Sequence, residues 1–343
     1  MIKPLLTAIE KGWIPDPIIR LGIRKLIQQR IQEDIPQTVD RAQAKTWEHV
    51  QALKNSAIAI ETKKANEQHY ELPPEFFKLC LGNRRKYSAC VWTDTTQDLN
   101  QAEINSLEQI VERLQVQDGH KILELGCGWG SLTLFMAEKF PKSPITAVSN
   151  SAPQRLHIQS ECQKRGLTNV NIITADINQL KLAESFDRVV SIEMFEHMRN
   201  YQALFEKVSS WMNSGALLFI HIFTHKSVPY FFETDGDHNW MGRYFFSGGQ
   251  MPSNDLLLYF AAGLEPVGHW TLDGTHYAKT SEAWLVNMDR NRAEILKIFA
   301  TTYPGQVTLW WNRWRIFYLS VAELFNYRNG QEWCVTHHLF KKP

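Results

Sequence analysis

The stretch Lys121–Ser131, KILELGCGWGS, decides the fold of this 343-residue chain. Its apolar run ends in three glycines at every second position, Gly126, Gly128 and Gly130. The next segment, 132–139, carries apolar residues at helical spacing. A buried strand, a tight turn and a helix in this order open a doubly wound α/β domain. Glycine suits such a turn because a Cβ would block either the turn or the approach of a ligand to the backbone.

The residues around this turn indicate which ligand it holds. The spacing G-C-G-W-G differs from the dinucleotide pattern G-x-G-x-x-G, and the Lys-Ser/Thr end of a phosphate loop is missing. Glu124 lies two residues before Gly126, at the carboxyl end of the strand. A carboxylate there attracts a cationic ligand and repels a pyrophosphate. We therefore predict an S-adenosylmethionine (SAM) site with Glu124 near the amino-acid part of SAM. The alternative is a plain strand–helix turn with Glu124 as a surface acid.

Composition narrows the class of protein. A hydrophobic content of 44% lets the chain bury a sizeable core, as one large domain or two small ones. The net charge of +1 gives no reason to expect nucleic acid as a partner. The five cysteines are odd in number and show neither paired nor metal-ligand spacing, which indicates reduced thiols and no metal site. The start lacks the apolar region of a signal peptide, and the apolar runs are too short to span a bilayer. We expect a soluble, cytoplasmic protein.

The first 65 residues predict helices that are interrupted by prolines. One of them, 18–31, is amphipathic and basic. Such a helix either touches acidic lipid headgroups or packs its apolar face on its own domain, and we favour the second interpretation. The irregular aromatic segments that follow, around 69–77 and 86–92, are of a kind that closes over a cofactor.

Apolar runs at 144–149, 170–174, 186–192 and 215–223 predict four further strands. Asn150 and Gln154, after the second strand of the sheet, can hydrogen-bond a ribose without adding charge. After the third strand, Asp176 can accept from an adenine amine while Ile177 lies on the ring.

The strand 186–192 is followed by Glu193, Glu196 and His197. Ligands of open α/β sheets bind outside the carboxyl ends of the strands. Residues three and four positions apart face the same side of a helical turn, so we expect these three side chains to converge. Two carboxylates and an imidazole in one place are costly unless they bind a ligand or move protons. The alternative is a set of polar residues that orient the loop.

The segment 224–250 is long, irregular and aromatic, which indicates a lid or a pocket wall. A helical stretch around 281–303, a Trp-rich helix at 309–325 and a final strand at 333–340 complete the chain.

Taken together, these motifs resemble the cyclopropane-fatty-acid synthase superfamily of SAM-dependent methyltransferases, over about residues 65–343. The markers are YELPPEFF (70–77), KYSACVW (86–92), ILELGCGWGSL (122–132), AVSNSAPQ (147–154) and SIEMFEHM (191–198). Within this superfamily the chain is most similar to the coclaurine N-methyltransferase group of plant alkaloid enzymes. That similarity lies in HYAKTSEAWL (276–285), WRIFYLSVAELFNYRNGQEW (314–333) and HLFKKP (338–343).

The resemblance implies an α/β fold with a Rossmann-like class I methyltransferase sheet. It implies an N-terminal helical cap and cofactor-covering segment at 1–95 and a methyltransferase domain at 96–343, with a lid insertion at about 224–280. The implied reaction is SAM-dependent N-methylation of a small, aromatic, benzylisoquinoline-like amine. Two other hypotheses stay open: a cyclopropane-fatty-acyl-phospholipid synthase or related lipid methyltransferase with 18–31 as its membrane contact, and a SAM-binding regulator with a degenerate site. The oligomeric state is open, a homodimer included.

The motifs and the resemblance together assign three sets of site residues. Cofactor contacts are predicted at Tyr87, Ser88, Glu124, Gly126, Cys127, Gly128, Gly130, Asn150, Gln154, Asp176, Ile177 and Ile192. The predicted catalytic residues are Glu193, Glu196 and His197, which the resemblance places at the acceptor nitrogen. Tyr70, Tyr277 and Trp333 are predicted to border the acceptor pocket.

Two positions depart from the cyclopropane synthases. Those enzymes hold a bicarbonate ion with, among others, a Cys after Tyr-Ser and a His on the fifth strand. This chain has Ala89 at the first position and, in an ungapped register, Ile220 at the second, with Cys90 and His221 one residue away. These departures favour an amine over a fatty acid as the acceptor.

Overall fold

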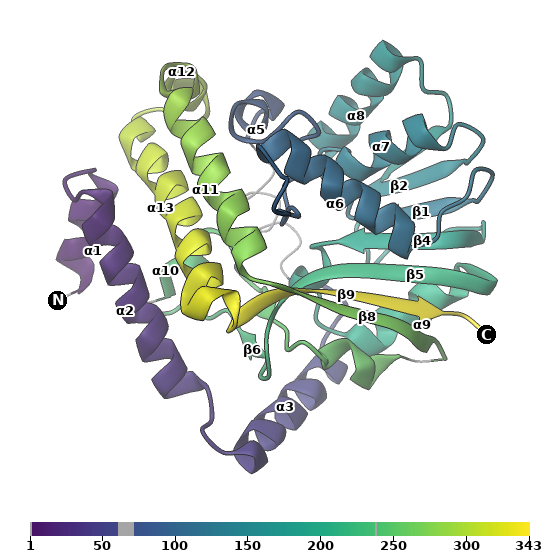
Figure 1. Ribbon diagram of the computed structural model, residues 1–343, viewed down its shortest axis with the longest axis horizontal. Helices are drawn as coiled ribbons and strands as arrows, with labels where there is room; N and C mark the ends of the chain where they lie inside the picture. Colours follow the sequence, from purple (N-terminus) through teal and green to yellow (C-terminus); the bar gives the residue numbers. More distant parts are fainter. Residues whose placement is uncertain (1, 61–71, 237–238, 262) are drawn as a thin grey trace.

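The computed structural model describes residues 2–60, 72–236, 239–261 and 263–343, and a seven-stranded sheet forms its centre (Figure 1). The strands lie in the order β3-β2-β1-β4-β5-β9-β8, and neighbouring strands are parallel from β3 to β5 and antiparallel from β5 to β8. Their bounds are β1 Ile122–Leu125, β2 Ile145–Ser149, β3 Val170–Thr174, β4 Phe186–Ile192, β5 Met212–His225, β8 Glu265–Asp273 and β9 Trp333–Lys341. The predicted α/β sheet is confirmed.

The strand order places the ligand-binding crevice. The chain passes from β1 to β2 and β3 on one side, then returns to β4 and β5 on the other side of β1. Ligands of doubly wound sheets bind at this reversal, outside the carboxyl ends of the strands. The residues that follow β1 and β4 therefore meet at one place.

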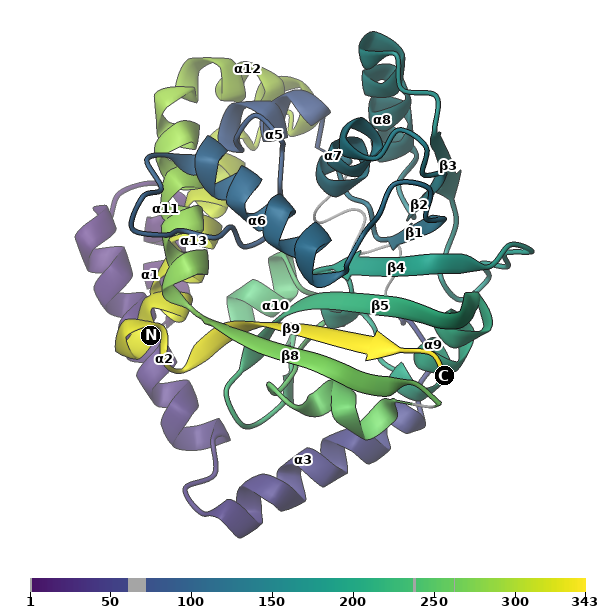
Figure 2. The ribbon, with the colours of Figure 1, turned by 45° about the vertical axis from the view of Figure 1, so that its right-hand side comes forward.

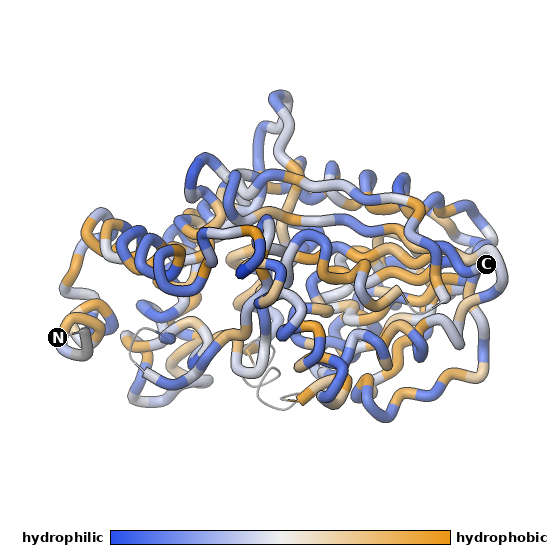
Figure 3. Tube along the Cα trace, turned by 90° about the horizontal axis from the view of Figure 1, so that it is seen from below, coloured by the Kyte–Doolittle hydropathy of each residue, from blue (hydrophilic) through white to orange (hydrophobic). Residues whose placement is uncertain are grey.

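Helices cover both faces of the sheet (Figures 1 and 2). On one face lie α6 (Leu99–Arg113), α7 (Ser131–Lys139) and α8 (Ala152–Arg165); on the other lie α3 (Val39–Lys54) and α9 (Tyr201–Ser210). Each face has its own apolar layer, since Phe219 packs with α6 and α7 and Leu218 packs with α3 and α9. Hydrophobic residues accordingly concentrate along the central strands (Figure 3). Burial on both faces explains why these strands read as continuous apolar runs.

A further helical layer lies beside the antiparallel end of the sheet. It contains α1 (Ile2–Glu10), α2 (Asp16–Asp34), α5 (Pro74–Cys80), α11 (Thr275–Arg290), α12 (Arg292–Thr302) and α13 (Val307–Asn326). The basic helix α2 buries Ile19 and Ile27 in this layer. Arg20 bridges Glu282 of α11 and Glu323 of α13 at 2.5 and 2.9 Å. The interpretation in which this helix packs on its own protein is thus the one observed.

The segment at about 224–280 differs from the single lid expected there. It contains β6 (Tyr230–Phe231), α10 (Trp240–Tyr244), β7 (Gln250–Met251) and the 3₁₀-helix Leu256–Phe260, but also β8 and the start of α11. Residues 265–273, assigned to the lid from sequence, are instead a strand of the central sheet. As an edge strand with mostly exposed or half-exposed residues, β8 lacks the apolar run of the inner strands. The helix expected at 281–303 is two helices that meet at Asn291.

Candidate active site

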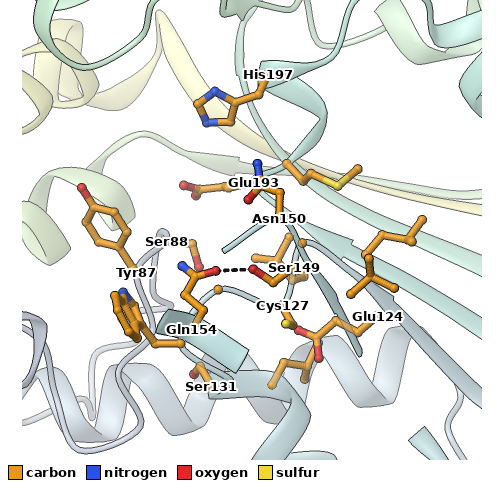
Figure 4. A pocket seen from close by; sticks show the side chains of 18 of the residues that line it. Tyr87, Ser88, Glu124, Cys127, Ser131, Ser149, Asn150, Gln154, Glu193 and His197 are labelled. Atoms are coloured by element: carbon orange, nitrogen blue, oxygen red, sulfur yellow. Dashed lines mark hydrogen bonds between the residues drawn. The ribbon is translucent and has the colours of Figure 1, made fainter. Parts of the chain in front are cut away.

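A cavity opens where β1, β2 and β4 end, and it brings most of the predicted site residues together (Figure 4). It contains about 1270 Å³ of empty space including its open mouth. The predicted residues that line it are Tyr87, Ser88, Glu124, Gly126, Cys127, Gly128, Asn150, Gln154, Asp176, Ile177, Ile192, Glu193 and His197. Gly130, Glu196, Tyr277 and Trp333 lie outside the lining, and Tyr70 lies outside the described residues.

The three glycines of the turn have left-handed backbones but different surroundings. Their φ angles are +78° at Gly126, +52° at Gly128 and +81° at Gly130. A Cβ on Gly130 would come within 2.7 Å of Ile158, so this glycine permits the packing of α8 and does not face the cavity. A Cβ on Gly128 would meet no described atom within 4 Å. Gly128 thus leaves open the space that a ligand over the turn requires.

Hydrogen-bond donors gather at the ribose end of the cavity. Ser149 donates to Gln154 Oε1 at 2.6 Å, which fixes the amide so that its nitrogen is the free end. The amide nitrogen of Gln154, the indole nitrogen of Trp129 and the hydroxyl of Ser131 are buried and find no partner among the described residues. Buried donors without partners are rare in folded proteins. Three of them around one cavity therefore indicate a ligand with several acceptor oxygens.

Glu124 is buried and is not the surface acid of the alternative interpretation. Its Oε2 accepts a hydrogen bond from the hydroxyl of Thr133 on α7. Burial raises the pKa of Glu124 to about 8, and the Thr133 hydrogen bond opposes this only in part. The carboxyl group is therefore largely protonated at pH 7 in the free protein, and a cationic ligand would favour its ionised form.

Glu193 is held in a left-handed backbone conformation, with φ +46°, and donors surround its carboxylate. Oε1 accepts from the backbone N–H of Ala89 at 2.9 Å and lies 3.1 Å from Nε2 of His221. Oε2 accepts from the hydroxyl of Tyr277 at 2.7 Å. Burial raises the pKa of Glu193 above its usual value, and the charge of Lys86 and the bonds from Ala89 and Tyr277 oppose this only in part. Tyr277 reaches the site through this carboxylate.

His197 and Glu196 follow on one turn of 3₁₀-helix, Phe195–His197, but face different surroundings. The His197 ring lines the cavity and stacks on Phe246, with ring centres 5.5 Å apart and planes 8° apart. Burial lowers the pKa of His197 to about 4, so the ring is neutral at pH 7. Glu196 is fully buried and accepts from the backbone N–H of Phe223 on β5 at 2.8 Å. Burial, followed by the charge of Glu193, raises its pKa well above the usual range.

Other structural partners were not identified from sequence. Lys86 is buried beside the cavity and donates to Ser88 Oγ and Ala89 O at 2.6 and 2.5 Å. Lysine is seldom buried, so only its place in the marker KYSACVW could have pointed to it. On β5, Ile220, the residue selected by the ungapped register, packs in the core, whereas its neighbour His221 contacts Glu193. Neighbouring residues of a strand point to opposite faces, so a shift of one exchanges them.

Trp333, predicted to border the acceptor pocket, is fully buried and lies outside the lining of this cavity. Its indole N–H donates to the hydroxyl of Tyr230 at 3.0 Å. The wall beside His197 comes from Phe246, which also contacts Phe223 and Phe232.

Several known proteins are similar to this chain over most of its length. The sequence model of the mycolic acid cyclopropane synthetase family matches residues 58–331. The (S)-coclaurine N-methyltransferase of Papaver somniferum is 40% identical over 345 residues, covering 99% of this chain and 98% of that protein. That of Thalictrum flavum subsp. glaucum is 39% identical over 348 residues, covering 100% and 96%. The chain belongs to the coclaurine N-methyltransferase-like group of this family.

The solved structures agree with this membership. A crystal structure of coclaurine N-methyltransferase bound to N-methylheliamine and SAH superposes with a TM-score of 0.96, at 38% identity and 99% coverage of both chains. The cyclopropane synthase MmaA2 from Mycobacterium tuberculosis shares the fold, with a TM-score of 0.72 at 21% identity over 84% of this chain. The predicted class I methyltransferase fold is confirmed.

As a member of this group, the protein is a SAM-dependent methyltransferase, as predicted. The cavity fits SAM on its own chemistry, because the free donors of Gln154, Trp129 and Ser131 match hydroxyl and carboxylate oxygens. Glu124 supplies an ionisable carboxyl group for a cation. Gly128 leaves the backbone accessible between them.

Proposed function

We propose that this methyltransferase methylates the nitrogen of a small aromatic amine of the benzylisoquinoline type. The observation that carries the proposal is the pairing of Glu193 and His197. A carboxyl group that follows β4 and a neutral imidazole from the next turn face the cavity that fits SAM, and the imidazole stacks on the aromatic wall of Phe246. The relatives named as coclaurine, pavine and tetrahydroprotoberberine N-methyltransferases support an aromatic amine as the acceptor.

The residues act on the charge state of the amine. An alkylamine is mostly an ammonium ion at neutral pH and then has no lone pair. The Glu193 carboxylate attracts the ammonium form, and the aromatic wall favours a cation over its ring faces. His197, a neutral imidazole beside the amine site, accepts the proton. Burial lowers the pKa of His197 and the charge of Glu193 opposes this only in part, so that the ring is a weak base in the free enzyme.

Alignment supplies the rest of the catalysis. When bound, SAM supplies an electrophilic methyl group on a sulfonium. The turn at Gly126–Gly130 and the end of β4 hold the two halves of the cavity at fixed separation, because both are backbone segments anchored in the same sheet. Fixed orientation of two reactants is a large source of rate enhancement. In Figure 4 Glu193 and His197 lie on the same side of the cavity, away from Ser131 and Glu124.

The lipid alternative is weaker on this geometry. The resemblance assigns a bicarbonate ion of the cyclopropane synthases to groups after Tyr-Ser and on the fifth strand. Here the N–H of Ala89 and Nε2 of His221 both contact the carboxylate of Glu193. The side chain of Glu193 therefore occupies the donors that such an ion would use.

Three further predictions remain part of this proposal. We propose that residues 1–95 cap a catalytic domain at 96–343, supported by the packing of α2 and α5 on α11 and α13. We propose that the lid predicted at about 224–280 lies in the part of that segment before β8, supported by Ser247 on the cavity wall and by buried Arg199, which donates to Gly248 O and Gly249 O at 3.1 and 3.4 Å. A cytoplasmic location is supported by the free thiols of all five cysteines. No helix in the described parts of the chain is long and apolar enough to cross a bilayer.

Methyl transfer from labelled SAM tests the proposal. The protein is incubated with a panel of tetrahydroisoquinolines, phenylalkylamines and aliphatic amines, and separately with vesicles of unsaturated anionic phospholipid. We expect label in an N-methylated aromatic amine, identified by mass spectrometry, and its loss in Glu193→Gln. Label found only in phospholipid, or only in aliphatic amines, would overturn the proposed acceptor.

A further inference from the structure

A row of buried side chains leads from the Glu193 carboxylate toward the β8 edge of the sheet. Nε2 of His221 lies 3.1 Å from Glu193 Oε1, and Nδ1 of His221 lies 2.8 Å from Nε2 of His337. Nδ1 of His337 lies 2.5 Å from a guanidinium nitrogen of Arg113. The two histidines are almost completely buried, and Arg113 is half-buried at the end of α6.

The sheet register produces this row. His337 on β9 is paired with His221 on β5, which is paired with Ile192 on β4, the residue before Glu193. On its other side His337 is paired with Trp270 on β8, and the guanidinium of Arg113 lies 4.7 Å from the centre of the Trp270 ring. Paired residues of neighbouring strands project from the same face of a sheet, so one row connects the exposed edge to the active site.

The chemistry of Arg113 fixes where the protons of this row lie. A guanidinium can donate hydrogen bonds but cannot accept them. Nδ1 of His337 must therefore be an acceptor, and its proton lies on Nε2. That proton is donated to Nδ1 of His221, so His221 carries its own proton on Nε2 and donates it to Glu193. Burial lowers the pKa of both histidines well below the usual range, helped by the charge of Arg113, so both rings are neutral.

We propose that Arg113 and His337 are positioning residues that hold His221 as the Nε2–H tautomer and so keep Glu193 ionised at the acceptor nitrogen. The part that concerns the acceptor rests on the proposed function; the tautomer does not. Neither residue lines the cavity. The other groups that face the Glu193 carboxyl are the Tyr277 hydroxyl, the Ala89 N–H, the Lys86 ammonium, the His197 ring and the Glu196 carboxyl.

The row also has a direction. To carry a proton outward from Glu193, each ring would have to take up a proton on one nitrogen and release a proton from its other nitrogen to the next group. The last group is Arg113, which cannot accept a proton. The row therefore supports the charge of Glu193 without draining protons from the site. His197, which lies outside the row, remains the group that takes the proton of the amine.

Without Arg113 both rings can invert their tautomers. His221 would then present a lone pair to the Glu193 carboxylate, which disfavours the ionised form. We expect Arg113→Met and His337→Phe to raise the pH at which kcat reaches half its maximum by about one unit, and to lower kcat at pH 7 by about tenfold. KM for SAM should stay unchanged. His337→Gln, whose amide can accept from Arg113 and donate to His221, should restore most of kcat.

The matched control is His338→Phe. His338 is the next residue on β9, points to the opposite face, and stacks on Phe340. The His338→Phe variant should keep the wild-type pH profile of kcat.

The tautomer itself is measured by nitrogen-15 NMR of the full-length protein with labelled histidines, without amine substrate. We expect a protonated Nε2 and an unprotonated Nδ1 at His221 in the wild type, and a mixture in Arg113→Met. A His221 proton on Nδ1 in the wild type, or an unchanged profile in both Arg113→Met and His337→Phe, would overturn the inference. A wild type with the expected tautomer that binds SAM but methylates no amine would refute the proposed acceptor instead.

Discussion

Replacing His197 separates its chemistry from its packing. The ring stacks on Phe246 and lines the cavity, so it would be in contact even if it took no part in the reaction. His197→Phe keeps a flat ring in the stack and removes both nitrogens, whereas His197→Ala removes the ring as well. If the imidazole only packs, the phenylalanine variant keeps its activity; if it accepts a proton, both variants lose it.

The size of the expected loss follows from the state of the ring. With a pKa of about 4, His197 is protonated in about one molecule in a thousand at pH 7, so the ring is in its basic form. A positioned general base contributes about 10² to 10⁴ in rate, or about 3 to 5 kcal/mol of activation free energy. The stacked pair contributes about 1 kcal/mol to stability. The loss of rate should therefore be far larger than any loss from packing.

The assay is steady-state turnover on the methylated amine, combined with calorimetry of SAM binding. We expect kcat of both variants to fall by about 10² to 10⁴, while the Kd for SAM changes by less than about tenfold because the ribose-side donors are intact. Added imidazole should restore part of the activity of His197→Ala. A phenylalanine variant with near wild-type kcat would refute the role of His197 as a base.

Three other perturbations have outcomes that the structure fixes. Gly128 and Gly166 both have left-handed backbones with open space around an added Cβ, so alanine should cost each about 1 kcal/mol of stability. Only Gly128→Ala should weaken SAM binding in calorimetry. Equal weakening in both variants would contradict the role of Gly128 in leaving space for the ligand. The pKa of Glu124 is about 8 and a cation favours its ionised form, so SAM affinity should rise from pH 6.5 to 9 and binding should release protons. The proton release is measured by calorimetry in buffers of different ionisation enthalpy. Glu124→Gln should show neither effect. Burial and the neighbouring charge of His269 lower the pKa of His338 to about 3, so between pH 7.5 and 5.5 the unfolded chain binds a proton there that the folded chain does not. As the pH is lowered over this range, the free energy of unfolding in urea should decrease in both proteins, and the decrease should be smaller by about 1.4 kcal/mol in His338→Phe than in the wild type. The same decrease in both proteins would show that His338 is not held neutral.

The inner part of the fold was readable from sequence. The strands expected at 170–174 and 186–192 are β3 and β4 without change. In β4, which has a neighbouring strand on each side, the apolar run ends sharply at the polar residue Glu193. The edge strand β8 was not predicted, because its sequence contains Pro266 and Gly268 and its side chains are mostly exposed, as in a loop. The break between α11 and α12 at Asn291 was also missed, since two amphipathic helices in sequence look like one.

The site was readable where it depends on local sequence and not where it depends on side-chain direction. The cofactor residues after β1, β2 and β3 line the cavity because a strand end fixes where the next residues lie. Glu196 was expected to face the same side as Glu193, but the left-handed backbone of Glu193 turns the chain before the 3₁₀ turn. Glu196 then points at β5. The contacts of His221 and Tyr277 with Glu193 join residues far apart in sequence, and spacing alone cannot supply them.

A crystal structure of the protein with SAH and an aromatic amine tests the central claim most directly. The account predicts the ribose and amino-acid oxygens at Gln154, Trp129 and Ser131, and the amine nitrogen within hydrogen-bond distance of Glu193 or His197. An amine nitrogen bound elsewhere, with Glu193 still enclosed by Ala89, His221 and Tyr277 and His197 turned from the ligand, would contradict it.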